Sequence, residues 1–133
     1  MCRRDHPLAS RRTVKLRDLA GCPIIHLARS TSVRQHLEPV LRDVPHSNSG
    51  FEVEQLPTAA ALVSSGLGVA LVPALTLSYF RELAAVRVDE PALARRVLVV
   101  QRKGRSLSSP AQEMLAMVEE HIGRAKRPRR RAR

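Results

Sequence analysis

Clustered hydroxyl side chains stand at the start of two segments that have the residue pattern of an α-helix. Ser30, Thr31 and Ser32 precede one segment, and Thr58 precedes the other. The first turn of a helix presents backbone N–H groups without intrahelical partners and carries a partial positive charge. If both helix starts face one hollow, they can hold a carboxylate or another small anion. Ser30, Thr31, Ser32 and Thr58 are therefore candidate residues for binding a small anion.

The same hydroxyls also have a purely structural interpretation. Ser and Thr are favoured N-caps, because their side-chain oxygens accept hydrogen bonds from N–H groups of the first helical turn. Ser32 and Gln35 have the spacing of a capping box, and Thr58 can cap the alanine-rich turn that follows it. Arg29 and Arg34, beside the first hydroxyl cluster, would add positive charge to a ligand site. The residue pattern alone leaves capping and ligand binding both open.

The sequence lacks the motifs that mark dinucleotide-binding sites, metal sites and nucleophilic serines. Gly66 and Gly68 form a GxG that follows a predicted helix, whereas a dinucleotide fingerprint follows a strand and opens a helix. The five histidines show neither HExxH nor i,i+4 spacing, and no GxSxG surrounds a serine. Cys2 and Cys22 form no CxxC pair, so we expect reduced thiols without a role. We expect no metal, no cofactor and no enzymatic activity.

The segment from Pro57 to Pro73 organises the predicted fold. A helix is expected to begin at Thr58 and to end at Gly66, where glycine accepts the left-handed conformation at no cost. The apolar run Val69–Val72 then has the pattern of a strand that is covered on both faces. The unit is therefore a helix, a glycine turn and a buried strand.

Predicted strands and helices alternate along the rest of the chain. Strands are expected at 23–28, 51–56, 86–89 and 97–100, helices at 32–44, 74–83 and 109–123, and a loop at 45–50. Pro39 predicts a bend near Glu38, because proline removes a helical hydrogen bond. Ser109 is expected to cap the last helix, and Gly123 to end it. The alternation predicts an α/β fold, a three-layer-like sandwich in which a mixed, mostly parallel sheet is flanked by helices.

Three stretches carry a family resemblance. They are the HPLA of residues 6–9 followed by 14–19, the segment Cys22–Arg34, and residues 62–69 with Pro73. In this order they resemble the second lobe of the substrate-binding (effector-binding) domain of bacterial LysR-type transcriptional regulators. That domain shares its fold with type 2 periplasmic binding proteins. The resemblance extends over residues 6–122.

The resemblance implies a cytoplasmic protein that binds a small-molecule effector, an organic acid, between lobes at the loops that start these helices. The family's helix-turn-helix, linker helix and first lobe have no counterpart here, which implies a truncated regulator that does not recognise an operator by itself. In the family, the strand at 97–100 returns through the hinge and the final helix packs on the first lobe. Without that lobe, an exposed helix stripe favours a homo-oligomer or pairing with a full-length relative.

The positive charge lies at the two ends of the chain. The formal net charge is +11, whereas residues 19–123 carry ten basic and ten acidic side chains. We expect a basic N-terminal segment and crossover remnant at 1–18, an effector-binding lobe at 19–92, a return strand and C-terminal helix at 93–123, and a disordered basic tail at 124–133. The tail leaves two alternatives open: a protein that associates with nucleic acids nonspecifically, or an inactive remnant. No apolar run is long enough to span a membrane, and the N-terminus lacks a secretory signal.

Overall fold

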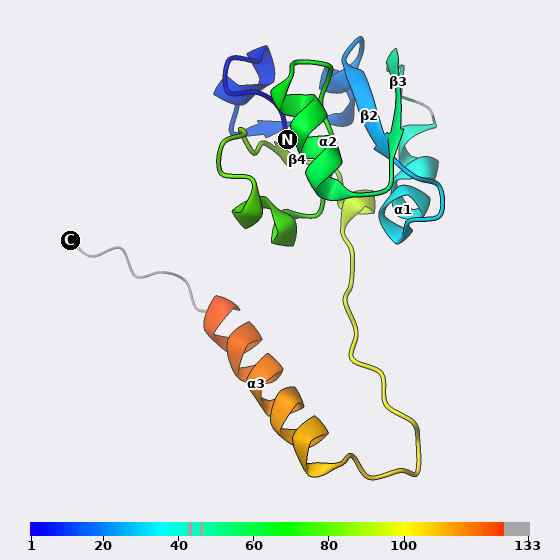
Figure 1. Ribbon diagram of the computed structural model, residues 1–133, viewed down its shortest axis with the longest axis vertical. Coiled ribbons are helices and arrows are strands. Elements are labelled where there is room, and N and C mark those ends of the chain that lie inside the picture. The colour runs from blue at the N-terminus through cyan, green and yellow to red at the C-terminus, as the bar shows by residue number, and fades with distance from the viewer. Residues whose placement is uncertain (43, 46, 127–133) are drawn as a thin grey trace, which may run out of the picture. The chain divides into compact units, whose positions relative to one another are not determined.

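The computed structural model describes residues 1–42, 44–45 and 47–126 (Figure 1). The chain forms two compact units, Met1–Arg96 and Val97–Arg133. From residue 127 onward, the tail that the sequence predicts to be disordered lies outside the described residues. Residues 124–126 of that segment are the last residues of a helix.

Two pairs of parallel strands form the framework of the first unit. β2 (Pro23–Leu27) pairs with β3 (Ser47–Val53), and β1 (Thr13–Val14) pairs with β4 (Arg87–Val88). On the other side of β2, Val69 forms an isolated parallel bridge with Ile24. The parallel pairing and the flanking helices confirm the predicted α/β class. The predicted strand at 69–72 is reduced to this single bridge.

Two helices cover opposite faces of β2. α1 (Ser32–Leu41) brings Leu41 into one core cluster with Ile24, while α2 (Leu56–Ser64) brings Ala59, Ala60 and Val63 into a second cluster with Ile25 and Leu27. Successive side chains of a strand point to opposite faces, so Ile24 and Ile25 must contact different layers. The order of layers is therefore α1, sheet, α2 (Figure 1).

The start of α2 differs from the prediction. Gln55 is its N-cap and makes no side-chain capping bond, so Thr58 lies inside the first turn and is not a cap. The physical reason is Pro57, because proline fits the first turn, where its missing N–H has no intrahelical acceptor to lose. At the other end, Gly66 has a φ of +81° and ends the helix as predicted.

β3 begins earlier than predicted, so the expected loop at 45–50 is strand from Ser47 onward. Ser47 and Asn48 pair with Pro23 and Ile24, and the Ser49 hydroxyl donates to the carbonyl of Ile24 at 2.7 Å. Pairing along β2 thus overrides the turn propensity of these polar residues. α1 continues through Pro39 as far as Leu41.

Four short 3-10 segments complete the first unit: η1 (Pro7–Ser10), η2 (Leu16–Leu19), η3 (Ala74–Tyr79) and η4 (Pro91–Leu93). The α-helix predicted at 74–83 is wrong in type and length, because η3 replaces it. η3 buries none of its residues, so no packing stabilises a longer helix there. At the start of the chain, backbone hydrogen bonds join Met1 to Ala70 and Cys2 to Ala84.

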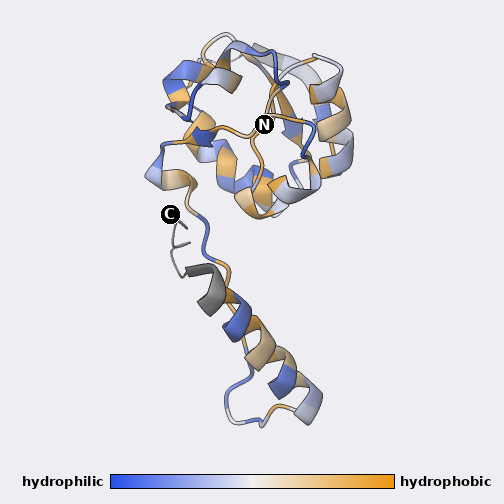
Figure 2. Ribbon diagram, turned by 90° about the vertical axis from the view of Figure 1, so that its left-hand side faces the viewer, coloured by the Kyte–Doolittle hydropathy of each residue, from blue (hydrophilic) through white to orange (hydrophobic). Residues whose placement is uncertain are grey.

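Among the described residues of the second unit there is one helix, α3 (Ser109–Lys126), along which hydrophilic and hydrophobic residues are interspersed (Figure 2). Gly123 lies inside α3, so the prediction that it ends the helix is wrong. A single glycine inside a helix costs only about 1 kcal/mol relative to alanine. The strand predicted at 97–100 is also wrong: these four residues form no strand in the described structure and are 66–87% exposed. Among the described residues, no helix is long and apolar enough to cross a membrane.

Candidate functional site

Thr31 organises the start of α1. Its Oγ1 accepts a hydrogen bond from the backbone N–H of Arg34 at 3.2 Å and donates one to the carbonyl of Ala28 at 2.7 Å. Thr31 is therefore the N-cap, and the predicted capping box of Ser32 and Gln35 is wrong by one residue. The first bond of the helix runs from the N–H of Gln35 to the carbonyl of Thr31 at 3.1 Å. The N–H groups of Ser32 and Val33, in the first turn, therefore have no acceptor within the helix.

The other two hydroxyls of the first cluster are exposed beside this cap. Ser30 lies in the turn after β2, and Ser32 is the first residue of α1. The Ser32 hydroxyl accepts a hydrogen bond from Arg95 Nη2 at 3.3 Å. The N–H of Arg29 in the same turn donates to Glu52 Oε1 at 3.3 Å. Cationic and anionic side chains from distant positions thus meet at this turn.

The structure relates the two helix starts through the sheet. β2 and β3 are parallel, and each leads into a helix. α1 and α2 therefore both begin at the carboxyl ends of these strands (Figure 1). Ser30, Thr31 and Ser32 are contiguous at the start of α1. Thr58 is exposed in the first turn of α2, on the helix that covers the other face.

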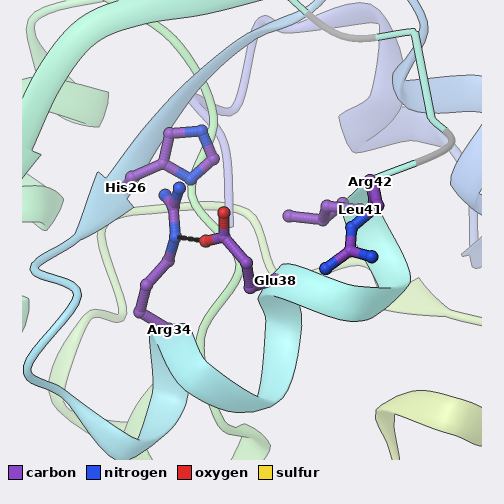
Figure 3. A pocket seen from close by; sticks show the side chains of 5 residues that line it. All are labelled: His26, Arg34, Glu38, Leu41 and Arg42. Atoms are coloured by element: carbon purple, nitrogen blue, oxygen red, sulfur yellow. Dashed lines mark hydrogen bonds and ion pairs between the residues drawn. The ribbon is translucent and has the colours of Figure 1, made fainter.

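A cavity that sequence analysis did not predict lies between α1 and β2. Its volume is about 120 Å³, and the described residues that line it are His26, Arg34, Glu38, Leu41 and Arg42 (Figure 3). We call it the α1–β2 cavity. The sequence carried one usable signal, the i,i+4 spacing of Arg34 and Glu38, which form an ion pair. Nothing in the sequence showed that His26, on β2, would face the same space.

Three of the described residues that line the α1–β2 cavity carry charged side chains: Arg34, Glu38 and Arg42. The Nε of Arg34 donates to Glu38, whereas its Nη1 is buried and has no hydrogen-bond partner among the described residues. The hydrogen bond from Arg34 lowers the pKa of Glu38, and the nearby positive charge acts in the same direction. Glu38 is therefore ionised near neutral pH. Among the described residues that line the cavity, Arg34 and Arg42 carry guanidinium groups and Glu38 carries a carboxylate.

Residues 1–123 match the sequence model of the LysR substrate binding domain. The chain belongs to this family. Two bacterial relatives are each 32% identical to it: YbhD of Escherichia coli K12, over 120 residues, and YybE of Bacillus subtilis 168, over 119 residues. Both are described as uncharacterized HTH-type transcriptional regulators. The matches cover 88% and 89% of this chain but only 38% and 41% of the relatives, so the chain spans about two fifths of their length.

A solved structure supports the fold. The regulatory domain of Synechocystis PCC6803 CcmR, in complex with 2-PG, superimposes with a TM-score of 0.75 at 22% identity. The similarity covers 90% of this chain and 60% of that chain. The match to the family model confirms the predicted family, and this structural similarity confirms the predicted fold, that of the periplasmic binding proteins.

Proposed function

We propose that this chain provides effector binding in a LysR-type transcriptional regulator, and that its effector is a small organic acid held by its carboxylate at the starts of α1 and α2. The observation that carries this proposal is the parallel pairing of β2 and β3, because both helix starts then lie at one edge of the sheet. Helix N-termini favour anions. The complex of the CcmR regulatory domain with 2-PG supports a small-molecule ligand for a protein of this fold.

The hydroxyls take different roles in this proposal. The Thr31 hydroxyl already donates to the carbonyl of Ala28 and accepts from the N–H of Arg34, so its role is to stabilise the first turn of α1. The exposed hydroxyls of Ser30, Ser32 and Thr58 are the groups that would donate to the carboxylate. Arg95, which already reaches Ser32, would add positive charge beside it.

The proposed role is ligand binding and not catalysis. Its place is the bacterial cytoplasm, where a transcriptional regulator meets the DNA that it controls. We assign no operator recognition to residues 1–123, because the relatives extend far beyond the matched region. Pairing with a second copy or with a full-length relative is part of the same proposal.

A thermal-shift screen of small carboxylates tests this function. A ligand at one hundred times its Kd stabilises the folded state by about 2.7 kcal/mol, which raises the melting temperature by several degrees. Thr58→Ala should reduce that shift and leave the melting temperature of the free protein almost unchanged, since Thr58 caps no helix. Thr31→Ala should lower the melting temperature of the free protein itself, because losing an N-cap costs about 1 kcal/mol.

Two outcomes would contradict the proposal. One is a broad panel of mono- and dicarboxylates that leaves the melting temperature unchanged. The other is a stabilising carboxylate whose effect survives the combined replacement of Ser30, Ser32 and Thr58 by alanine.

A further inference from the structure

Residues 94–108, which we call the linker, span the boundary between the two compact units. They follow η4 and precede α3, and they contain neither helix nor strand (Figure 1). Between residues 95 and 107, the described chain makes one backbone–backbone hydrogen bond, from the N–H of Arg105 to the carbonyl of Arg102 at 3.4 Å. Backbone pairing therefore does not hold the linker in place.

The linker is also largely exposed and basic. The side chains of Val97–Val100 are 66–87% exposed. The linker has no acidic residue, and its five basic residues are all exposed: Arg95, Arg96, Arg102, Lys103 and Arg105. Exposed segments without regular structure are preferred sites of proteolytic cleavage, and trypsin-like proteases hold a basic side chain in their specificity pocket. The linker thus offers both the access and the side chains that such a protease needs.

Basic residues of the first unit, by contrast, lie on hydrogen-bonded backbone at several positions. Arg87 pairs with Thr13 between β4 and β1, and Arg34 lies within α1. The N–H of Arg11 donates to the carbonyl of Leu8 at 3.1 Å. A protease reaches such peptide bonds only after local unfolding, so the cleavage rate there depends on how often the segment opens. We therefore expect the linker to be cleaved before the first unit.

We propose that the linker is a processing site, at which a protease specific for basic side chains separates the two units. Water adds across the peptide bond that follows a basic residue, which leaves a carboxylate on that residue and a free amine on the next one. The buried apolar residues of the described chain lie between Cys2 and Leu83, so the N-terminal product keeps the whole core of the first unit. It also keeps the hydroxyls at the starts of α1 and α2, so this site does not depend on the proposed function.

Limited digestion of the full chain with trypsin, followed by mass spectrometry of the intact products, tests this site. Within residues 1–123, the first cuts should fall in the linker, and the N-terminal product should be cleaved further about tenfold more slowly. Glutamine is not a trypsin site, so a variant with all five basic linker residues replaced should lose these first cuts: Arg95→Gln, Arg96→Gln, Arg102→Gln, Lys103→Gln and Arg105→Gln. A matched control replaces five exposed basic residues of the first unit and should leave the rate of linker cleavage unchanged: Arg12→Gln, Lys15→Gln, Arg17→Gln, Arg81→Gln and Arg87→Gln.

Digestion of the parent chain with thermolysin, which cleaves beside apolar residues, gives a second measurement that needs no variant. It should cut first at Val97–Val100 and spare the core of the first unit. Protection of Val97–Val100 from thermolysin would show that the linker is covered and would overturn the proposal. A first tryptic cut between Met1 and Arg87, or an N-terminal product that is degraded as fast as the linker is cut, would overturn it as well.

Discussion

Two apolar runs of the same pattern have opposite fates in this molecule. Val69–Val72 and Val97–Val100 are both four-residue apolar runs, yet Val69 is 4% exposed and the four residues of the second run are 66–87% exposed. The difference is that Val69 has backbone hydrogen-bond partners on the neighbouring strand β2. The N–H of Val69 donates to Pro23 at 2.9 Å, and its carbonyl accepts from Ile25 at 2.9 Å. An apolar run therefore becomes part of a sheet only where a neighbouring strand pairs its backbone.

The same contrast separates the two compact units. The buried apolar residues of the described chain all lie between Cys2 and Leu83, within the unit Met1–Arg96. In the unit Val97–Arg133, α3 exposes Met114, Met117 and Ile122 by 68%, 70% and 48%. The first unit thus has its own core, and its stability should depend on packing in a way that the second unit does not share.

A matched pair of alanine substitutions tests this difference and should give the largest change in stability. Ile24 is 1% exposed between β3 and the bridge residue Val69, so Ile24→Ala should destabilise the first unit by about 2–5 kcal/mol. Val99→Ala, at a position 67% exposed, should change its stability by less than about 0.5 kcal/mol. Urea unfolding followed by the methyl NMR signals of Val63, in the first unit's core, measures both.

Similar losses in the two variants would break the comparison, since they would mean that Val99 contributes to the same core as Ile24. A small loss in Ile24→Ala would be equally damaging. It would show that the contacts of β2 with β3 and Val69 are not what stabilises the first unit.

The elements that sequence predicted correctly are those whose signals are local. The run PIIHL formed β2, the Gly66 stop ended α2, and the alternation of elements gave the α/β class. The errors arose where distant residues decide. Ser47 and Asn48 have turn propensity but become strand because β2 pairs with them, whereas Val97–Val100 has strand propensity but forms no strand in the described part of the chain.

A pair of glycines sharpens the comparison with a smaller effect. A Cβ added to Gly68 would lie 2.4 Å from the carbonyl oxygen of Pro23, so Gly68→Ala forces the chain away from β2. We expect a loss of about 1–3 kcal/mol for this overpacking. Gly104, in the second unit, has open space around it, and Gly104→Ala should leave the unfolding midpoint of the first unit unchanged. An unaltered midpoint in Gly68→Ala would show that the backbone of Gly68 does not need its close approach to Pro23.

The candidate sites repeat this division between local and distant signals. The hydroxyls at 30–32 predicted a capped helix start, and the structure has the cap at Thr31. The α1–β2 cavity could not be predicted from the sequence. It depends on which face of β2 carries His26 and on how α1 is rotated to bring Arg34 to the same space. The prediction that Thr58 is an N-cap is wrong because Pro57 favours the first turn of a helix, which places Thr58 inside α2.

The smallest effect we predict concerns acid. The Arg34 partner keeps the folded-state pKa of Glu38 below its ordinary value, so the pair contributes stability that is fully present above that ordinary value of 4.5 and is lost as the pH falls through the folded-state pKa. The Glu38 side chain is 43% exposed, so solvent screens the ion pair and limits its contribution to stability. Glu38→Gln should therefore reduce the urea midpoint near neutral pH slightly and make the first unit lose less stability between about pH 6 and pH 3. Glu119→Gln, on the exposed surface of α3, should leave the pH dependence of the first unit unchanged. If Glu38→Gln loses as much stability in acid as the parent chain, the ion pair does not couple protonation to the folding of the first unit.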